Sequence, residues 1–234
     1  MMDDIPQFSG FPKETLQFYA ELKDNNYREW FNERKDHYQE YVLKPAQAFV
    51  VAFGERLKKL SDGITYDTRT NGRGSILRIY RDIRFSKDKT PYNTHLRMRF
   101  GEGEGEKGKY PGFFFAMDET GGRLLGGLHK FAKSTLDSYR EAVVNEKTGS
   151  SLATIVERIR FQPGFEIGGV HYKRVPRGYD VDHPRADLLR HDALYVRSPE
   201  IPVSLLKKPD LVDTCYDHAL TIAPVHHWLA NLAR

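Results

Sequence analysis

The chain has 234 residues, of which 39% are hydrophobic and 29% are charged, and its formal net charge is +4. This length and composition allow one sizeable hydrophobic core or two small ones. The single cysteine, Cys215, excludes an internal disulfide and a metal site built from several cysteines. The first residues lack the profile of a signal peptide, and no run approaches the roughly 20 apolar residues of a membrane helix. We therefore expect a cytoplasmic protein without a membrane partner.

The first sixty residues carry apolar side chains at helical spacing. This spacing predicts a short helix over residues 12–23 and a longer helical stretch over residues 27–60. Pro45 should break or kink the longer stretch into two helices of about equal length, because a proline inside a helix removes a hydrogen bond and clashes with the preceding turn. The Ser-Asp-Gly sequence at residues 61–63 predicts the end of this helical region.

The middle of the chain alternates apolar and polar residues, which is typical of half-buried strands. We predict strands over residues 76–86 and 94–100 that can pair as a hairpin, and further strands over residues 110–118 and 123–129. The first two strands each have an apolar parity and a basic parity. If they pair, one surface of the sheet carries four arginines, namely Arg78, Arg84, Arg97 and Arg99.

The remaining segments complete a predicted α+β fold. Residues 101–109 alternate glycine with charged residues and predict a solvated loop. Further on we predict helices over 133–145, 151–159 and 184–194, a basic Gly- and Pro-rich stretch over 168–184, a strand over 195–197 and a mostly helical tail over 210–233. Strands with helices on both sides indicate one α+β domain over residues 1–234, with a central antiparallel sheet of about four or more strands. Its predicted parts are a helical part (12–60), a β part (64–130) and a mostly helical part (131–234).

Positive charge is concentrated in one part of the chain. Between Arg69 and Arg99 there are nine lysines and arginines and two acidic residues, so this segment carries +7 while the whole chain carries +4. The other residues therefore sum to −3. Because the charge is local, an anionic partner bound at one place is favoured over general attraction to the whole surface.

Arg81 is unusual because it lies on the apolar parity of the first predicted strand. A guanidinium on that side should point toward the core or a cleft, where it needs a partner. One interpretation is a buried ion pair with Asp88, Glu33 or Glu29, and the other is a role in binding an anion. A bulge in the strand would reset the parity.

The same stretch offers a clamp for a phosphate or carboxylate group. Arg84 would supply a planar fork, while Lys87 and Lys89 would supply mobile point charges. Asp82 and Asp88 could instead act as general acid and base or hold a divalent metal, although they lie on opposite sides of the predicted strand end. The third interpretation is a solvated network of salt bridges that holds no ligand.

Aromatic residues accompany these charges. Tyr80 and Tyr92 are the candidates for stacking on a base, since bases stack on aromatic rings. Phe85 lies on the core parity, and we expect Trp30 and Phe31 to pack the first helices against the sheet.

A second basic group lies further along the chain. Lys173 and Arg177 would form a second wall of an anionic pocket or plain surface charge. The nearby His171, His183 and His191 match no zinc-ligand spacing, so we expect no metal site.

Two segments resemble the signatures of a known family. One is Asn26-Tyr-Arg-Glu-Trp-Phe31 with Arg34, and the other is Arg78-Ile-Tyr-Arg-Asp-Ile-Arg-Phe-Ser-Lys-Asp-Lys-Thr-Pro-Tyr92. Pro176-Arg-Gly-Tyr179 and His183-Pro184 fit the same pattern. Together these residues resemble the bacterial and fungal family catalogued as domain of unknown function 2461, over nearly the whole chain. The resemblance implies no activity, because the family has no established reaction. Asn93 departs from the pattern, which has a lysine there.

The basic segment and its tyrosines favour a protein that binds an anionic, phosphate-bearing ligand, a nucleotide or nucleic acid, on the basic sheet face and the loop over residues 86–93. The alternative is an enzyme acting on a phosphorylated or anionic small molecule, with Asp82 or Asp88 as catalytic candidates. In a further alternative the motif is a structural ion-pair network. The sequence implies no particular cofactor. The predicted ligand-binding residues are Arg78, Tyr80, Arg81, Arg84, Lys87, Lys89, Tyr92, Arg97, Arg99, Lys173 and Arg177.

Overall fold

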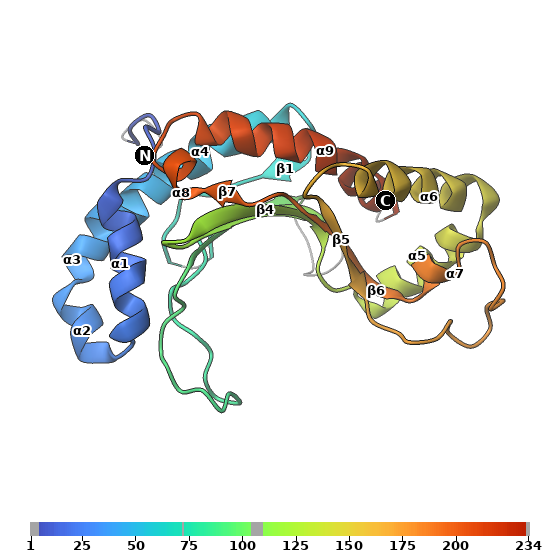
Figure 1. Cartoon of the computed structure of the whole chain (residues 1–234), viewed down its shortest axis with the longest axis horizontal. Helices are drawn as coiled ribbons and strands as arrows, with labels where there is room; N and C mark the ends of the chain where they lie inside the picture. The colour runs from blue at the N-terminus through green and yellow to red at the C-terminus, as the bar shows by residue number, and fades with distance from the viewer. Residues whose placement is uncertain (1–4, 72, 104–109, 233–234) are drawn as a thin grey trace.

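An antiparallel sheet forms the centre of the molecule (Figure 1). The computed structural model describes residues 5–71, 73–103 and 110–232. Within these ranges the sheet has seven strands in the order β1-β2-β3-β4-β6-β5, and β7 pairs with β4. The strands are β1 (Ile64–Thr65), β2 (Leu96–Glu102), β3 (Gly112–Met117), β4 (Gly121–Leu128), β5 (Glu166–Val170), β6 (His191–Arg197) and β7 (Ile201–Pro202).

The helices form an N-terminal and a C-terminal group, so the predicted α+β class with helices on both sides of the sheet in sequence is confirmed. The N-terminal group comprises α1 (Lys13–Asp24), α2 (Arg28–Glu33), α3 (Lys35–Tyr38), a π-helical turn (Gln39–Leu43) and α4 (Lys44–Lys58). The C-terminal group comprises α5 (Lys133–Val144), α6 (Glu146–Arg160), α7 (Ala186–Leu189), α8 (Val203–Leu206) and α9 (Leu211–Leu232). No helix in the described ranges is long and apolar enough to span a membrane.

The two faces of the sheet differ in what covers them. α4 and α9 cover one face (Figure 1), where the ring centroids of Phe49 and Phe115 lie 4.8 Å apart and those of Phe53 and Phe100 lie 5.0 Å apart. In the part of the chain that the structure describes, no helix crosses the opposite face. Instead α1, α2 and α3 lie beyond one end of the sheet, and α5 and α7 lie beyond the other (Figure 1). β2 therefore alternates buried and half-buried residues along its length.

We call the face without helices the open face, and the strand registers define which residues it carries. Residues directly opposite each other in antiparallel strands share a face. Arg99 lies opposite Phe114, and Arg97 lies opposite Ala116. The row that begins with Arg99 and Phe114 continues through Leu125 in β4 to Arg197 in β6. The row that begins with Arg97 and Ala116 continues to Arg123 in β4. The open face thus carries Arg97, Arg99, Phe114, Ala116, Arg123, Leu125 and Arg197.

The helical region around Pro45 is continuous, so of the predicted break or kink the break is wrong. Pro45 lies in the first turn of α4, where a missing N–H is tolerated. Because proline has no N–H, the carbonyl of Tyr41 lacks its helical donor. The Thr15 hydroxyl donates to that carbonyl instead. The chain passes this point through the π-helical turn, in which Lys44 N–H bonds the carbonyl of Gln39.

Residues 76–86 form only isolated bridges, so the prediction of a continuous strand is wrong. Ile76 pairs with Met98, and Tyr80 pairs with Tyr92. Between the two bridges, the segment from Tyr92 to Met98 has two more residues than the segment from Ile76 to Tyr80, so a bulge interrupts the ladder.

The chain then leaves the sheet as a loop on the open-face side (Figure 1). We call residues 78–93 the motif loop. As a result, Arg78 and Arg84 belong to this loop and do not share a strand surface with Arg97 and Arg99, contrary to the hairpin prediction.

The C-terminal half differs from the predictions in two places. β5 lies partly inside the stretch predicted as irregular, and β6 begins at His191, inside a predicted helix. Of that predicted helix only α7 forms, and it is four residues long. The tail prediction is confirmed by α9, which runs through Pro224. Residues 104–109 of the predicted glycine-rich loop lie outside the described residues.

Candidate functional site

The open face carries four arginines that differ in their pairing. Arg123 lies 3.5 Å from a carboxylate oxygen of Glu200, and Arg197 lies 3.4 Å from one of Glu166. Arg97 and Arg99 are half-buried, and no carboxylate of a described residue lies within ion-pair distance of either. Burial lowers the pKa of Arg97, and its Nε is buried without a hydrogen-bond partner among the described residues.

A hollow of about 1050 Å³ lies over one end of the open face. Its floor includes Arg99 and Phe114, and its walls come from residues within 65–69, 73–77 and 129–133. The glycines of the floor leave it concave, since a Cβ added at Gly101 would meet no atom within 4 Å.

Of the cations that line the hollow, some are paired with a carboxylate and others are not. Arg69 is paired with Asp67, and Lys130 lies 3.2 Å from Asp192. Arg73 and Lys133 also line the hollow and are exposed, and neither has an ion-pair partner in the described ranges. Together with Arg99 they give the hollow three positive charges that have no ion-pair partner among the described residues.

Aromatic rings lie next to Arg99 in the hollow. The ring of His129 lies 5.0 Å from that of Phe114 in an edge-to-face contact and 4.5 Å from that of Tyr195. Partial burial, and to a smaller extent Arg197, lowers the pKa of His129. Phe114 and His129 both line the hollow together with Arg99 and give it aromatic surface.

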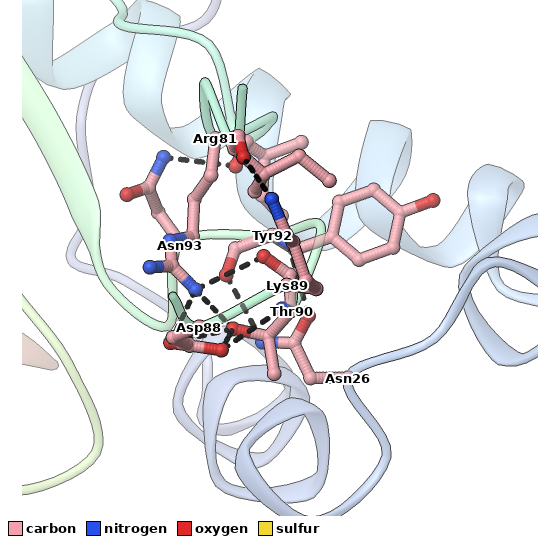
Figure 2. Close-up of polar contacts among 9 residues, drawn as sticks. Asn26, Arg81, Asp88, Lys89, Thr90, Tyr92 and Asn93 are labelled. Atoms are coloured by element: carbon pink, nitrogen blue, oxygen red, sulfur yellow. Dashed lines mark hydrogen bonds and ion pairs between the residues drawn. The ribbon is translucent and has the colours of Figure 1, made fainter. Parts of the chain in front are cut away.

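The motif loop is closed at its base by Arg81 (Figure 2). Arg81 Nη1 lies 2.6 Å from Asp88 Oδ2, donates to the Thr90 carbonyl at 3.0 Å and also contacts the Thr90 hydroxyl. The Thr90 N–H donates to Asp88 Oδ1 at 2.9 Å. The Thr90 N–H and the Arg81 guanidinium lower the pKa of Asp88 to about 2. The ion pair between Arg81 and Asp88 considered from the sequence is therefore present, but the Asp88 side chain is exposed, so the pair is not buried as that interpretation had it.

Asn26 joins the two signature segments. Its side-chain amide donates to the Tyr92 carbonyl at 3.0 Å and accepts from the Tyr92 N–H at 3.0 Å (Figure 2). The Tyr92 ring is 2% exposed and stacks on Phe31 at 4.4 Å between centroids. This corrects the prediction that Tyr92 offers a stacking face, because Phe31 already covers it. Asn93 donates its side-chain amide to the Ile79 carbonyl at 2.9 Å, a structural role that needs no cation.

The end of the motif loop holds a second ion pair. Arg84 forms a fork with Asp82, with distances of 2.9 Å from Nε and 2.7 Å from Nη2. Arg84 thereby lowers the pKa of Asp82 to about 2. Asp82 and Asp88 are thus each bound to a separate arginine and do not converge on one point. Carboxylates with such low pKa values are poor general bases at neutral pH.

Other residues of the motif loop are exposed. Phe85 is 95% exposed, so its predicted place in the core is wrong. The strand alternation that placed Phe85 on the core side ends before this residue, because no strand continues to that point. Tyr80 is 52% exposed, as expected for a stacking candidate. Lys89 donates to the Ile83 carbonyl at 3.0 Å.

The second basic group lies away from this region. Lys173 and Arg177 are exposed in the connection between β5 and α7, at the opposite end of the molecule from the motif loop (Figure 1), and they do not line the hollow. The nearby Arg185 is buried and donates to the Val143 carbonyl at 2.8 Å and to Glu146 at 3.1 Å. Its role is to join α5 to α6.

Sequence reasoning missed Phe114, His129 and Lys133. Phe114 had a usable signal, since it is the middle residue of three consecutive phenylalanines and alternation places it on the face opposite to its neighbours. The described residues contain no group of three or more His, Cys, Asp or Glu side chains placed to hold a metal ion.

A comparison with family models matches residues 14–228 to a family described as conserved hypothetical protein, domain of unknown function 2461. A search of curated proteins finds no match. The match covers most of the chain, including both signature segments and the strands that form the floor of the hollow. The chain therefore belongs to the family of conserved hypothetical proteins called domain of unknown function 2461.

Proposed function

We propose that this protein binds a phosphate-bearing ligand of nucleotide size in the hollow on the open face. The observation that carries the proposal is the half-buried guanidinium of Arg99, which lies on the floor of the hollow without a carboxylate partner among the described residues. Partly desolvated cations are costly unless an anion compensates them. A phosphate offers oxygens that match the planar fork of arginine.

The composition and size of the hollow support a small organic anion. A volume of about 1050 Å³ lies just above the range of about 300–1,000 Å³ for small-molecule sites. Phe114 on the floor and His129 in the wall supply aromatic surface on which a base or another flat ring can stack. Arg73 and Lys133 stand at the wall of the hollow, where further phosphate oxygens would reach them.

The proposed site keeps the sheet-face part of the predicted site, with Arg99, and leaves out the motif loop. Arg81 and Asp88 are occupied with each other, as the structural alternative requires, and neither lines the hollow. The enzymatic alternative gains no support from Asp82 and Asp88, because both carboxylates are engaged with arginines. Binding is therefore proposed here without a reaction.

The test is a calorimetric titration with ATP and ADP at low salt, using two matched variants. Arg99→Gln should weaken binding about tenfold or more, since a charge-assisted hydrogen bond contributes about 1.5–3 kcal/mol. Arg123→Gln is the control, because Arg123 lies on the same face but is already paired with Glu200. Its affinity should stay within about twofold of the wild type. Absence of wild-type binding, or equal binding by Arg99→Gln, would contradict the proposal.

A further inference from the structure

The end of the motif loop presents an aromatic ring to solvent. Phe85 is 95% exposed, the largest exposure among the large hydrophobic side chains that the structure describes. The Arg84 guanidinium carbon lies 5.8 Å from the centroid of the Phe85 ring. Burial of a phenylalanine ring is favourable, and at this position the fold leaves the ring in water.

Internal contacts hold this exposed end in place. Ser86 N–H donates to the Ile83 carbonyl at 3.3 Å, and Lys89 Nζ donates to the same carbonyl at 3.0 Å. The ion pair of Arg81 and Asp88 closes the loop below them. These contacts order the loop backbone that carries the ring before any partner binds, which lowers the entropy lost on binding.

The charge around Phe85 is positive. Residues 78–89 contain five lysines and arginines and two aspartates, a net charge of +3. Both aspartates already bind arginines of the loop. Arg78 and Lys87 are exposed, and neither has a carboxylate of a described residue within ion-pair distance. The free charge around the ring is therefore cationic and complements an anionic partner.

We propose that the end of the motif loop docks on single-stranded nucleic acid, with a base stacked on Phe85 and a phosphate at Lys87. Every base has a face that can stack on an aromatic ring, and lysine and arginine beside the ring follow the backbone. A membrane surface is less suited to this end, because Arg84 and Ser86 flank the ring and no second apolar side chain adjoins it in sequence. The docking is independent of the hollow, whose lining includes none of these residues.

Anisotropy of labelled dT20 and U20, measured from about 50 to 200 mM salt, tests this docking. Phe85→Ala should weaken binding about tenfold, within the range for loss of one stacked base, and leave the salt slope unchanged. Lys87→Ala should reduce the slope of log K against log salt by about 0.7. Phe161→Ala is the matched control, because Phe161 is 82% exposed at the end of α6 and should bind like the wild type.

Several outcomes would overturn the docking. Failure of the wild type to bind either oligonucleotide at the lowest salt would do so, as would equal losses in Phe85→Ala and Phe161→Ala. Binding to phosphatidylserine-containing vesicles that depends on Phe85, with no oligonucleotide binding, would assign the loop to a membrane instead. Arg99→Gln should keep its oligonucleotide affinity, so failure of the nucleotide proposal and failure of this one are distinguishable. All three loop and control substitutions are at exposed positions, and unchanged circular dichroism would verify that each variant folds.

Discussion

The Arg81 guanidinium and the Asp88 carboxylate lie 2.6 Å apart and close the motif loop at its base. Thr90 completes the contact, because its carbonyl accepts from Arg81 and its N–H donates to Asp88. Several charged side chains of the signature segment are therefore paired with each other within the loop. What it leaves exposed is the end of the loop around Phe85.

Asp88→Asn should loosen the loop without unfolding the protein. The neutral amide is a weaker acceptor for the Arg81 guanidinium than the carboxylate. We expect faster hydrogen exchange at the amides of Arg81 and Asn93, which bond the carbonyls of Pro91 and Ile79 across the base of the loop. Asp82→Asn, at the far end of the loop, is the control and should leave both amides protected. Unchanged exchange in Asp88→Asn would contradict the role of this ion pair.

Asn26→Ala should destabilise the whole fold. It removes both hydrogen bonds to the Tyr92 backbone and leaves a partly buried N–H and carbonyl without partners. An unsatisfied buried polar group costs about 1–3 kcal/mol, which should appear as a lower midpoint of urea unfolding. Asn71→Ala, at an exposed turn, should unfold like the wild type. Equal midpoints for the two variants would show that the Asn26 clamp does not stabilise the loop.

Strand parity was a better predictor of exposure than of secondary structure. Buried or half-buried residues alternate with exposed ones from Leu77 to Ile83, although no strand forms there. The alternation depends only on local extended backbone, whereas a strand also needs a continuous partner, which the bulge near His95 interrupts. Beyond Ile83 the local pattern carries no information on burial, and Phe85 is exposed.

The hollow could not be predicted from local patterns. The alternation in β2 places Arg97 and Arg99 together on one face, and this was predicted. Which face stays free of helices depends on how α4 and α9 pack against the sheet, a contact between segments far apart in the chain. Arg99 and Lys133, which both line the hollow, are also brought together from separate segments of the chain.

Gly126→Ala should destabilise the packing of α9 on β4. A Cβ at Gly126 would clash with Ile222 of α9 and lie 2.9 Å from the Phe113 ring. Overpacking of this kind costs about 1–3 kcal/mol, measurable as a lower denaturation midpoint. Gly101→Ala is the matched control, because its Cβ would meet no atom within 4 Å. Similar losses in both variants would contradict the close-packing role of Gly126.

His191 should make stability depend on pH. It is 3% exposed, with Nδ1 3.1 Å from the Ala193 carbonyl, and burial lowers its pKa below the ordinary value of 6.5. The folded state then binds fewer protons than the unfolded state just below pH 6.5, so the free energy of unfolding falls as the pH drops through that window. His191→Gln should flatten this fall, and substitution of the exposed His171 should not. Parallel pH profiles for the wild type and His191→Gln would contradict this origin.

Chemical-shift mapping of ADP on the labelled protein tests the central proposal most directly. The proposed site predicts that the largest amide shifts occur at Arg99, Phe114 and His129 around the hollow, and that Arg99→Gln abolishes them at the same ADP concentration. Shifts confined to the exposed connection around Lys173 and Arg177, or no shifts at millimolar ADP and low salt, would contradict it.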